Sequence, residues 1–165
     1  MTNYDNIPNE LRMLKQWVCA YAGSKVPMQA MVHMPASSTN PDTWATFDEA
    51  VAAVEEGYYD YIGFVFNDNG IVGIDIDDAF DAGGGISDLA ADIISRCQAY
   101  TERSKSGRGY HIFVKGDVPF KGKNNLAGVE MYKTARFFIM TGHQASAARH
   151  IPVNQEALDY IVDKY

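Results

Sequence analysis

The chain has 165 residues, of which 47% are hydrophobic, and this length suits one domain, or two lobes that share a core, rather than two independent domains. No apolar run approaches the roughly 20 residues that cross a bilayer, and the N-terminus lacks the basic start and apolar stretch of a secretion signal, so we expect a cytoplasmic protein without a membrane partner. The formal net charge of −7 argues against tight binding of nucleic acid by this chain alone, because phosphate contacts dominate such binding.

Helical patterns dominate the first third of the chain. A first helix is predicted after Pro8 from the spacing of four apolar residues, which are Leu11, Leu14, Trp17 and Val18. Residues 34–43 are rich in Pro, Ser, Thr and Asn, as is typical of an exposed loop. Thr46 and Glu49 have the spacing of a capping box, which predicts a second helix that ends at Gly57.

Strand patterns begin at residue 61. Two strands are predicted around a turn at residues 67–70, namely 61–66 and 71–77. The remaining predicted elements are strands 110–115, 129–132 and 136–141, a helix after Ser87, and a final helix after Asn154. Cys19 and Cys97 belong to no CxxC pair, so we expect buried free thiols. The sequence therefore predicts an α+β fold with a mainly antiparallel sheet.

Two aspartates stand on the predicted strand 71–77. Side chains alternate along a strand, so Asp75 and Asp77 point to one face while Ile74 and Ile76 point to the core. At about 3.3 Å per residue their Cα atoms lie roughly 7 Å apart, and carboxylates so close repel unless a cation lies between them. Magnesium and other hard divalent ions prefer such ligands. A solvated strand end that carries an acidic pair is the structural alternative.

A basic segment with two glycines follows at residues 104–113. Gly107 and Gly109 permit a tight turn whose backbone N–H groups stay open to a ligand. Three side chains offer donors and charge for phosphate oxygens, namely Lys105, Ser106 and Arg108. A strand follows the glycines, so the segment is neither a Walker loop nor a dinucleotide fingerprint. His111 on that strand is a candidate phosphate contact, although a lone histidine in a strand is more often structural.

A third set of candidate residues consists of an acidic side chain, Glu130, and a basic one, Arg136. Glu130 points away from Val129 and Met131, and the turn that follows would fold Arg136 back towards it. A plain hairpin with a surface Glu–Arg pair is the alternative. Together the three groups supply three carboxylates, a basic turn, a histidine and an arginine on neighbouring strands, which suits two-metal phosphoryl transfer.

These motifs resemble those of the archaeo-eukaryotic primase superfamily, and specifically the primase-polymerase catalytic domains of phages and plasmids. The segments stand in the family's order: IDID at 74–77, SGRGYH at 106–111, VEMY at 129–132 and RFFIMTG at 136–142. The resemblance implies one catalytic domain over residues 1–165, either complete or a fragment of a longer replication protein. It also implies an α/β lobe packed on a lobe like an RNA-recognition motif, with the active site between them.

The resemblance further implies a nucleotidyltransferase that joins nucleoside triphosphates on a DNA template and primer. Its implied metal ligands for Mg²⁺ or Mn²⁺ are Asp75, Asp77 and Glu130. His111 would contact the triphosphate, and the other implied nucleotide-binding residues are Lys105, Ser106, Gly107, Arg108, Gly109 and Arg136, with His143 as a weaker candidate. The implied partner is an accessory helical domain or a helicase.

Two other functions fit the same residues. One is a binding module of the same fold that holds nucleotide or nucleic acid without turnover, and the other is a metal-dependent nuclease. The intact acidic residues favour an enzyme over the module, because only a metal obviously requires them. The basic turn favours a triphosphate ligand over a scissile strand. The sequence leaves open the choice of deoxynucleotides or ribonucleotides, the template sequence and the oligomeric state.

Overall fold

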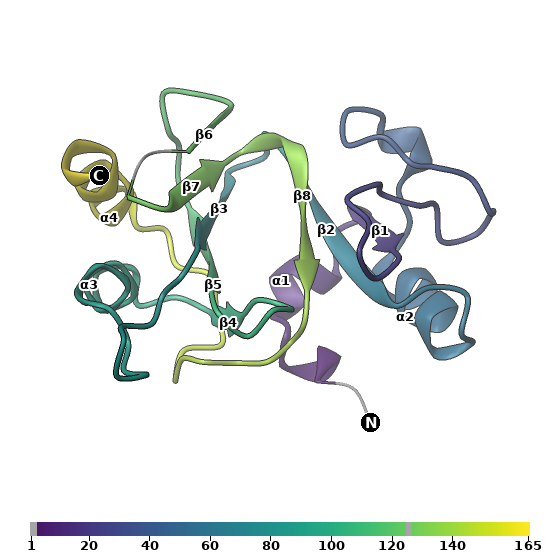
Figure 1. Ribbon diagram of the computed structural model, residues 1–165. Coiled ribbons are helices and arrows are strands. Elements are labelled where there is room, and N and C mark those ends of the chain that lie inside the picture. The colour runs from purple at the N-terminus through teal and green to yellow at the C-terminus, as the bar shows by residue number, and fades with distance from the viewer. Residues whose placement is uncertain (1–2, 125–126) are drawn as a thin grey trace.

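The computed structural model describes residues 3–124 and 127–165, and it confirms an α+β fold (Figure 1). The helices are α1 (Asn9–Arg12), α2 (Phe47–Glu55), α3 (Asp88–Cys97) and α4 (Gln155–Lys164), with 3₁₀ turns at Tyr4–Asn6 and Pro41–Thr43. The strands are β1 (Trp17–Ala20), β2 (Tyr61–Asn67), β3 (Ile71–Ile76), β4 (Thr101–Arg103), β5 (Tyr110–Lys115), β6 (Gly122–Asn124), β7 (Val129–Tyr132) and β8 (Thr134–Met140).

The strands form two antiparallel sheets rather than one. Three strands pair in the order β1-β2-β8, and five pair in the order β4-β5-β3-β7-β6. Only Lys133 separates β7, in the larger sheet, from β8, in the smaller one, and Figure 1 shows β8 curving away from β7. The segment 129–140 is therefore not a plain hairpin, because its two strands pair in different sheets.

Aromatic side chains fill the space between the sheets. Phe64 and Phe66 of β2 meet Phe113 of β5, with ring centroids 6.3 and 6.0 Å apart, and Phe66 also meets Phe138 of β8 at 4.8 Å. Gly73 of β3 permits this close approach, because a Cβ atom there would overlap the Phe66 ring and lie 2.6 Å from the Phe138 ring. The glycine thus helps to set the spacing of the two sheets beside the predicted acidic pair.

Helices α3 and α4 cover the opposite face of the five-stranded sheet (Figure 1). Ile74 and Ile76 of β3 pack there with Ile93 of α3 and Leu158 of α4, as the alternation along β3 predicts. Helix α2 packs instead on the three-stranded sheet, where Phe47 joins the core between the sheets. Each face of the five-stranded sheet is therefore covered, and polar groups on its inner face need a specific reason to be there.

Helix termini form as the sequence predicts. Thr46 and Glu49 complete a reciprocal capping box at the start of α2, with N–H to oxygen distances of 2.9 and 3.2 Å. Ser87 and Asn154 cap α3 and α4. Both cysteines are free and buried. No helix in the described part of the chain is long and apolar enough to span a bilayer.

The first helix is shorter than predicted. It ends at Arg12, and Trp17 and Val18 lie in β1 instead. Trp17 packs on Phe47 and Phe64, while Val18 packs on the other side of the sheet. Both faces of β1 are buried, so its sequence shows no alternation of apolar and polar residues. Strands β4 and β6 have three residues each and were not predicted, because so short a segment carries no readable period.

Candidate active site

A row of polar side chains crosses the five-stranded sheet. Strand register places Glu102 of β4 opposite His111 of β5. It also places Asp75 of β3 between His111 and Glu130 of β7. Residues directly opposite one another share a face, and Phe113, two positions beyond His111, lies in the core between the sheets. The row therefore faces the three-stranded sheet.

Asp75, Asp77 and Glu130 form an acidic cluster in which one ligand atom from each carboxylate lies within 4.8 Å of the others. Asp77 lies just beyond β3, where its N–H donates to the carbonyl of Gly128 at 3.0 Å. This bond keeps the end of β3 beside the start of β7. Oxygen ligands at this spacing fit a hard divalent cation such as Mg²⁺ or Mn²⁺.

Negative charge accumulates in the acidic cluster. Loss of solvent around the carboxylate of Asp77, and then repulsion from Asp75 and Glu130, raises the pKa of Asp77 to about 6. As a whole residue Asp77 is exposed, so its carboxylate keeps contact with solvent. Glu130 accepts a hydrogen bond from the Tyr132 hydroxyl at 2.6 Å and lies 3.9 Å from Nη2 of Arg136, as predicted. A bound cation would relieve the remaining repulsion.

His111 lies beside the acidic cluster and is only 8% exposed. Its ring stacks on the Phe138 ring with centroids 4.5 Å apart. Nε2 lies 3.5 Å from Oδ1 of Asp75, and Nδ1 lies 3.8 Å from Oε2 of Glu102. Burial by itself lowers the pKa of His111, but the two carboxylates outweigh it and raise the pKa to about 9. The two carboxylates therefore favour the protonated ring, a form suited to an anion.

The turn before β5 is closed by its own hydrogen bonds. The N–H of Gly107 donates to the Ser104 carbonyl at 2.9 Å, and that of Gly109 donates to the Ser104 hydroxyl at 3.2 Å. The N–H of Arg108 donates to the Ser106 hydroxyl, also at 3.2 Å. The prediction that the glycines leave their N–H groups open to a ligand is therefore wrong. Gly109 instead lets the turn lie against β3, since a Cβ there would come within 2.5 Å of a backbone oxygen of that strand.

A cavity of about 430 Å³ lies where the two sheets meet. It brings together most of the predicted site residues, namely Asp75, Asp77, Lys105, Ser106, His111 and Arg136. Glu130 joins them through the acidic cluster. Arg108 does not line the cavity: it pairs with Asp78 at 3.4 Å, and its side chain is 78% exposed. The long loop after β1 supplies the facing wall with Ser24, Lys25, Pro27 and Ser38.

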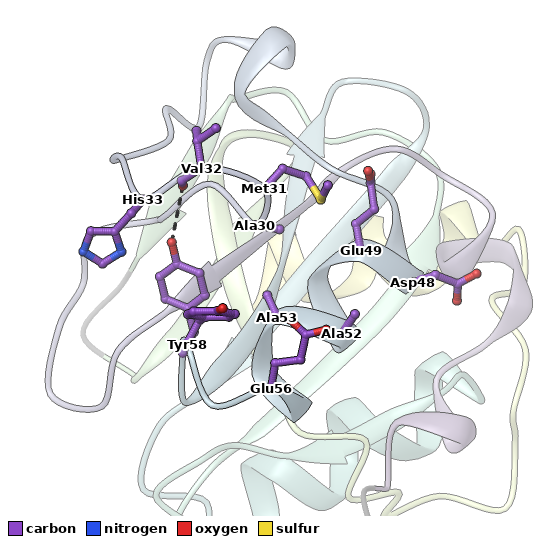
Figure 2. Close-up of a pocket in the computed structure, with 11 residues that line it drawn as sticks. Ala30, Met31, Val32, His33, Asp48, Glu49, Ala52, Ala53, Glu56 and Tyr58 are labelled. Atoms are coloured by element: carbon purple, nitrogen blue, oxygen red, sulfur yellow. Dashed lines mark hydrogen bonds between the residues drawn. The ribbon is translucent and has the colours of Figure 1, made fainter.

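A larger groove of about 540 Å³ lies between α2 and residues 30–33 (Figure 2). Its lining includes Asp48, Glu49 and Glu56 but neither Lys nor Arg, and Glu49 already serves the capping box of α2. An acidic rim without a cation repels the phosphates of a nucleotide. The smaller cavity, which holds both carboxylates and cations, is therefore the candidate active site.

Glu102 and Lys25 were not predicted as residues of this site. Glu102 is fully buried although it is an acid, and the only sequence signal for it is a charge within the otherwise unremarkable stretch 100–103. Lys25 belongs to a loop, and no periodic pattern indicates which surface a loop approaches. Both depend on contacts between distant parts of the chain.

Clustered carboxylates beside a cavity lined by cations define a candidate site for metal-dependent phosphoryl transfer. No protein-family model matches the chain. The chain is similar to a DNA primase-polymerase of Nitratiruptor phage NrS-1, with 31% identity over 136 residues, or 77% of this chain. It spans 19% of the length of that phage protein. The similarity supports the resemblance to primase-polymerases that the motifs indicate.

Proposed function

We propose that this chain is the catalytic core of a template-dependent nucleotidyltransferase, with DNA primase and DNA polymerase activity in phage or plasmid replication. The observation that carries the proposal is the acidic cluster of Asp75, Asp77 and Glu130 at a cavity that also presents Lys25, Lys105 and Arg136. The similarity to the phage primase-polymerase supports the same activity. Nucleoside triphosphates, a DNA template and a primer are the proposed substrates.

The proposed roles follow the placement of the side chains. The acidic cluster would hold Mg²⁺ or Mn²⁺, which when bound would polarise the reacting phosphate and offset the charge on the attacking and leaving oxygens. His111 would donate from its cavity side to a phosphate oxygen of the nucleotide. Lys105 and Ser106 reach the cavity from the turn before β5, and Arg136 reaches it from β8. Gly107 and Gly109 shape that turn, and Arg108 lies at its outer edge.

The chain itself would contribute mainly position and charge. In-line attack by a primer 3′-hydroxyl on the α-phosphorus forms one P–O bond and breaks another, and pyrophosphate leaves. A fixed imidazolium at His111 and the cations of Lys105 and Arg136 would favour the extended triphosphate and then the departing pyrophosphate. The cavity where the two sheets meet would hold the nucleotide against the acidic cluster.

The proposed DNA partner must be held by local positive charge, because the chain as a whole is acidic. An accessory helical domain or a helicase is therefore proposed as a further partner that supplies affinity for the template. Template binding by a separate domain is consistent with the length of the phage primase-polymerase, which is about five times that of the matched segment.

One extension experiment separates the proposed function from its alternatives. The protein is incubated with Mg²⁺ or Mn²⁺, a labelled primed template, and either deoxynucleotides or ribonucleotides. Primer extension supports the proposal, shortening of the strand indicates a nuclease, and an unchanged strand that is retained in a gel indicates a binding module. Extension should be absent in the double variant Asp75→Ala/Asp77→Ala. Full activity in that variant would show that the acidic cluster is not catalytic.

A further inference from the structure

We propose that Glu102 is a positioning residue for the active site, which holds the His111 ring and the end of β8 in the places that a bound triphosphate requires. The inference rests on the proposed function, because it assigns His111 to the nucleotide. Glu102 does not line the cavity, so it acts through its neighbours.

The carboxylate of Glu102 is fully buried and accepts three hydrogen bonds. The Tyr100 hydroxyl donates to Oε1 at 2.8 Å, and the Gly142 N–H donates to the same oxygen at 3.0 Å. The N–H of Thr141 donates to Oε2 at 2.8 Å, while the Thr141 hydroxyl donates to the carbonyl of Arg103 at 2.6 Å. An apolar side chain would serve packing at least as well as a buried charge. So complete a set of donors indicates that the negative charge itself is used.

His111 provides the second observation. Its Nδ1 is buried and has no hydrogen-bond partner within the part of the chain that the structure describes. Oε2 of Glu102 lies 3.8 Å from this nitrogen, and a movement of roughly 0.8 Å would bring the pair to ordinary hydrogen-bond length. The Phe138 ring stacks on the imidazole ring, and this contact limits how far the imidazole can tilt. Nε2 lies 3.5 Å from Oδ1 of Asp75, and His111 lines the cavity in which a ligand would bind.

Glu102 also fixes the opposite wall of the cavity. Thr141 and Gly142, which bind its carboxylate, directly follow β8, and β8 supplies the lining residues 136–139. Gly142 has φ +66°, and a Cβ there would overlap the carbonyl of Asn3, so the backbone at this point has little freedom. One carboxylate thus ties β4 and β5 of the larger sheet to the end of β8 in the smaller one.

The variant Glu102→Gln keeps the shape of the side chain and removes its charge. Nuclear magnetic resonance of the metal-free protein, labelled with ¹⁵N in its four histidines, reports on each imidazole ring. The ring signals of His111 should shift in the variant, while those of His33, His143 and His150 stay in place as internal controls. Unchanged His111 signals in a folded Glu102→Gln variant would overturn the proposal.

Nucleotide affinity supplies a second readout. Calorimetry with a non-hydrolysable nucleoside triphosphate and Mn²⁺ should show about tenfold weaker binding for Glu102→Gln, as expected when one charged hydrogen bond is weakened. Because Glu102 is proposed to act in part through His111, the double variant Glu102→Gln/His111→Ala should lose less affinity than the two single variants together. Additive losses would overturn that path. Glu10→Gln is the matched control, because it breaks a 2.7 Å ion pair with Lys115 and should leave affinity and the His111 signals unchanged.

Two other results are informative: unchanged nucleotide binding by His111→Ala, and failure of Glu102→Gln to fold. If His111→Ala binds nucleotide as tightly as the parent, the proposed nucleotide role of His111 fails, while the ring signals still decide whether Glu102 positions the ring. If Glu102→Gln does not fold, Tyr100→Phe removes one of the three donors and keeps the carboxylate. A smaller shift of the His111 signals is then expected, and its absence in folded Tyr100→Phe overturns the proposal.

Discussion

Asp77→Asn removes one charge from the acidic cluster and should stabilise the protein in the absence of metal. Two unit charges 4.8 Å apart repel by about 1 kcal/mol at the dielectric constant of water and by about 3 kcal/mol at an effective value of 20. Asp77 is exposed, so the lower figure applies. A gain of about 1 kcal/mol corresponds to an increase of about 2–4 °C in melting temperature for a domain of this size.

The gain should depend on pH with a defined sign. The pKa of Asp77 is raised to about 6, so the folded protein binds the proton more tightly than the unfolded chain does. The contribution of this group to stability therefore falls as the pH rises from about 4 to about 6. Asp77→Asn should thus melt above the parent at about pH 7.5, and the difference should shrink towards pH 5.

With metal bound, the parent should melt at a higher temperature than Asp77→Asn, the reverse of the metal-free order. Free Mn²⁺ at 100 times its dissociation constant stabilises a binding protein by about 2.7 kcal/mol, and a variant that lacks one of three ligands should gain far less. Thermal unfolding followed by tryptophan fluorescence, with and without Mn²⁺, measures both effects. Asp78→Asn is the matched control, because it removes the same charge from a side chain that is 80% exposed and paired with Arg108. The acidic cluster is refuted if metal-free Asp77→Asn melts below the parent, or if Mn²⁺ stabilises both equally.

Three further predictions concern nucleotide binding, packing and the template. His111→Ala should weaken nucleotide binding by about 1.5–3 kcal/mol in calorimetry, and parent affinity would make the histidine structural. Gly73→Ala should lower the free energy of unfolding in urea by about 1–3 kcal/mol, because its Cβ overlaps the Phe66 ring; an unchanged value would mean that the sheets adjust freely. Binding of single-stranded DNA, measured by fluorescence anisotropy, should be weak, with a log–log salt slope of about −3, and tight binding that ignores salt would contradict the charge argument. That slope assumes contacts from Lys105, Lys121, Lys123 and Arg136. Arg108 and Lys115 are left out because they lie 3.4 and 2.7 Å from a carboxylate, whereas Arg136 lies 3.9 Å from Glu130.

Features that depend on one short segment were predictable from the sequence. Alternation along β3 put Asp75 on the inner face and Ile74 in the core, and the structure confirms both positions. The capping box at Thr46 and the caps at Ser87 and Asn154 also form as predicted, because a cap depends only on residues within one turn of the helix.

Features that depend on pairing between distant strands were not predictable. The position of Glu102 beside His111 follows from the register of β4 on β5, and a strand of three residues shows no period from which to read a register. The sequence also does not indicate that the chain moves from one sheet to the other at Lys133, because the sequence of β7 and β8 suits a hairpin equally well. Hydrogen bonds within the turn before β5 closed N–H groups that glycine content alone suggested were open.

The distribution of charge along the chain explains how an acidic protein could still hold a template. Between Lys25 and Arg96 the sequence has thirteen Asp and Glu and neither Lys nor Arg, whereas from Arg96 to the end it has eleven Lys and Arg and six Asp and Glu. The acidic part includes α2, and the basic part includes β6 and the turn before β5; Figure 1 shows α2 and β6 on opposite sides of the molecule. Salt screens exposed charges over about 8 Å at physiological ionic strength, so a phosphate near β6 responds to Lys121 and Lys123 rather than to the acids of α2. The net charge of −7 therefore does not describe the surface near β6, and the proposed template would lie along β6 to β8.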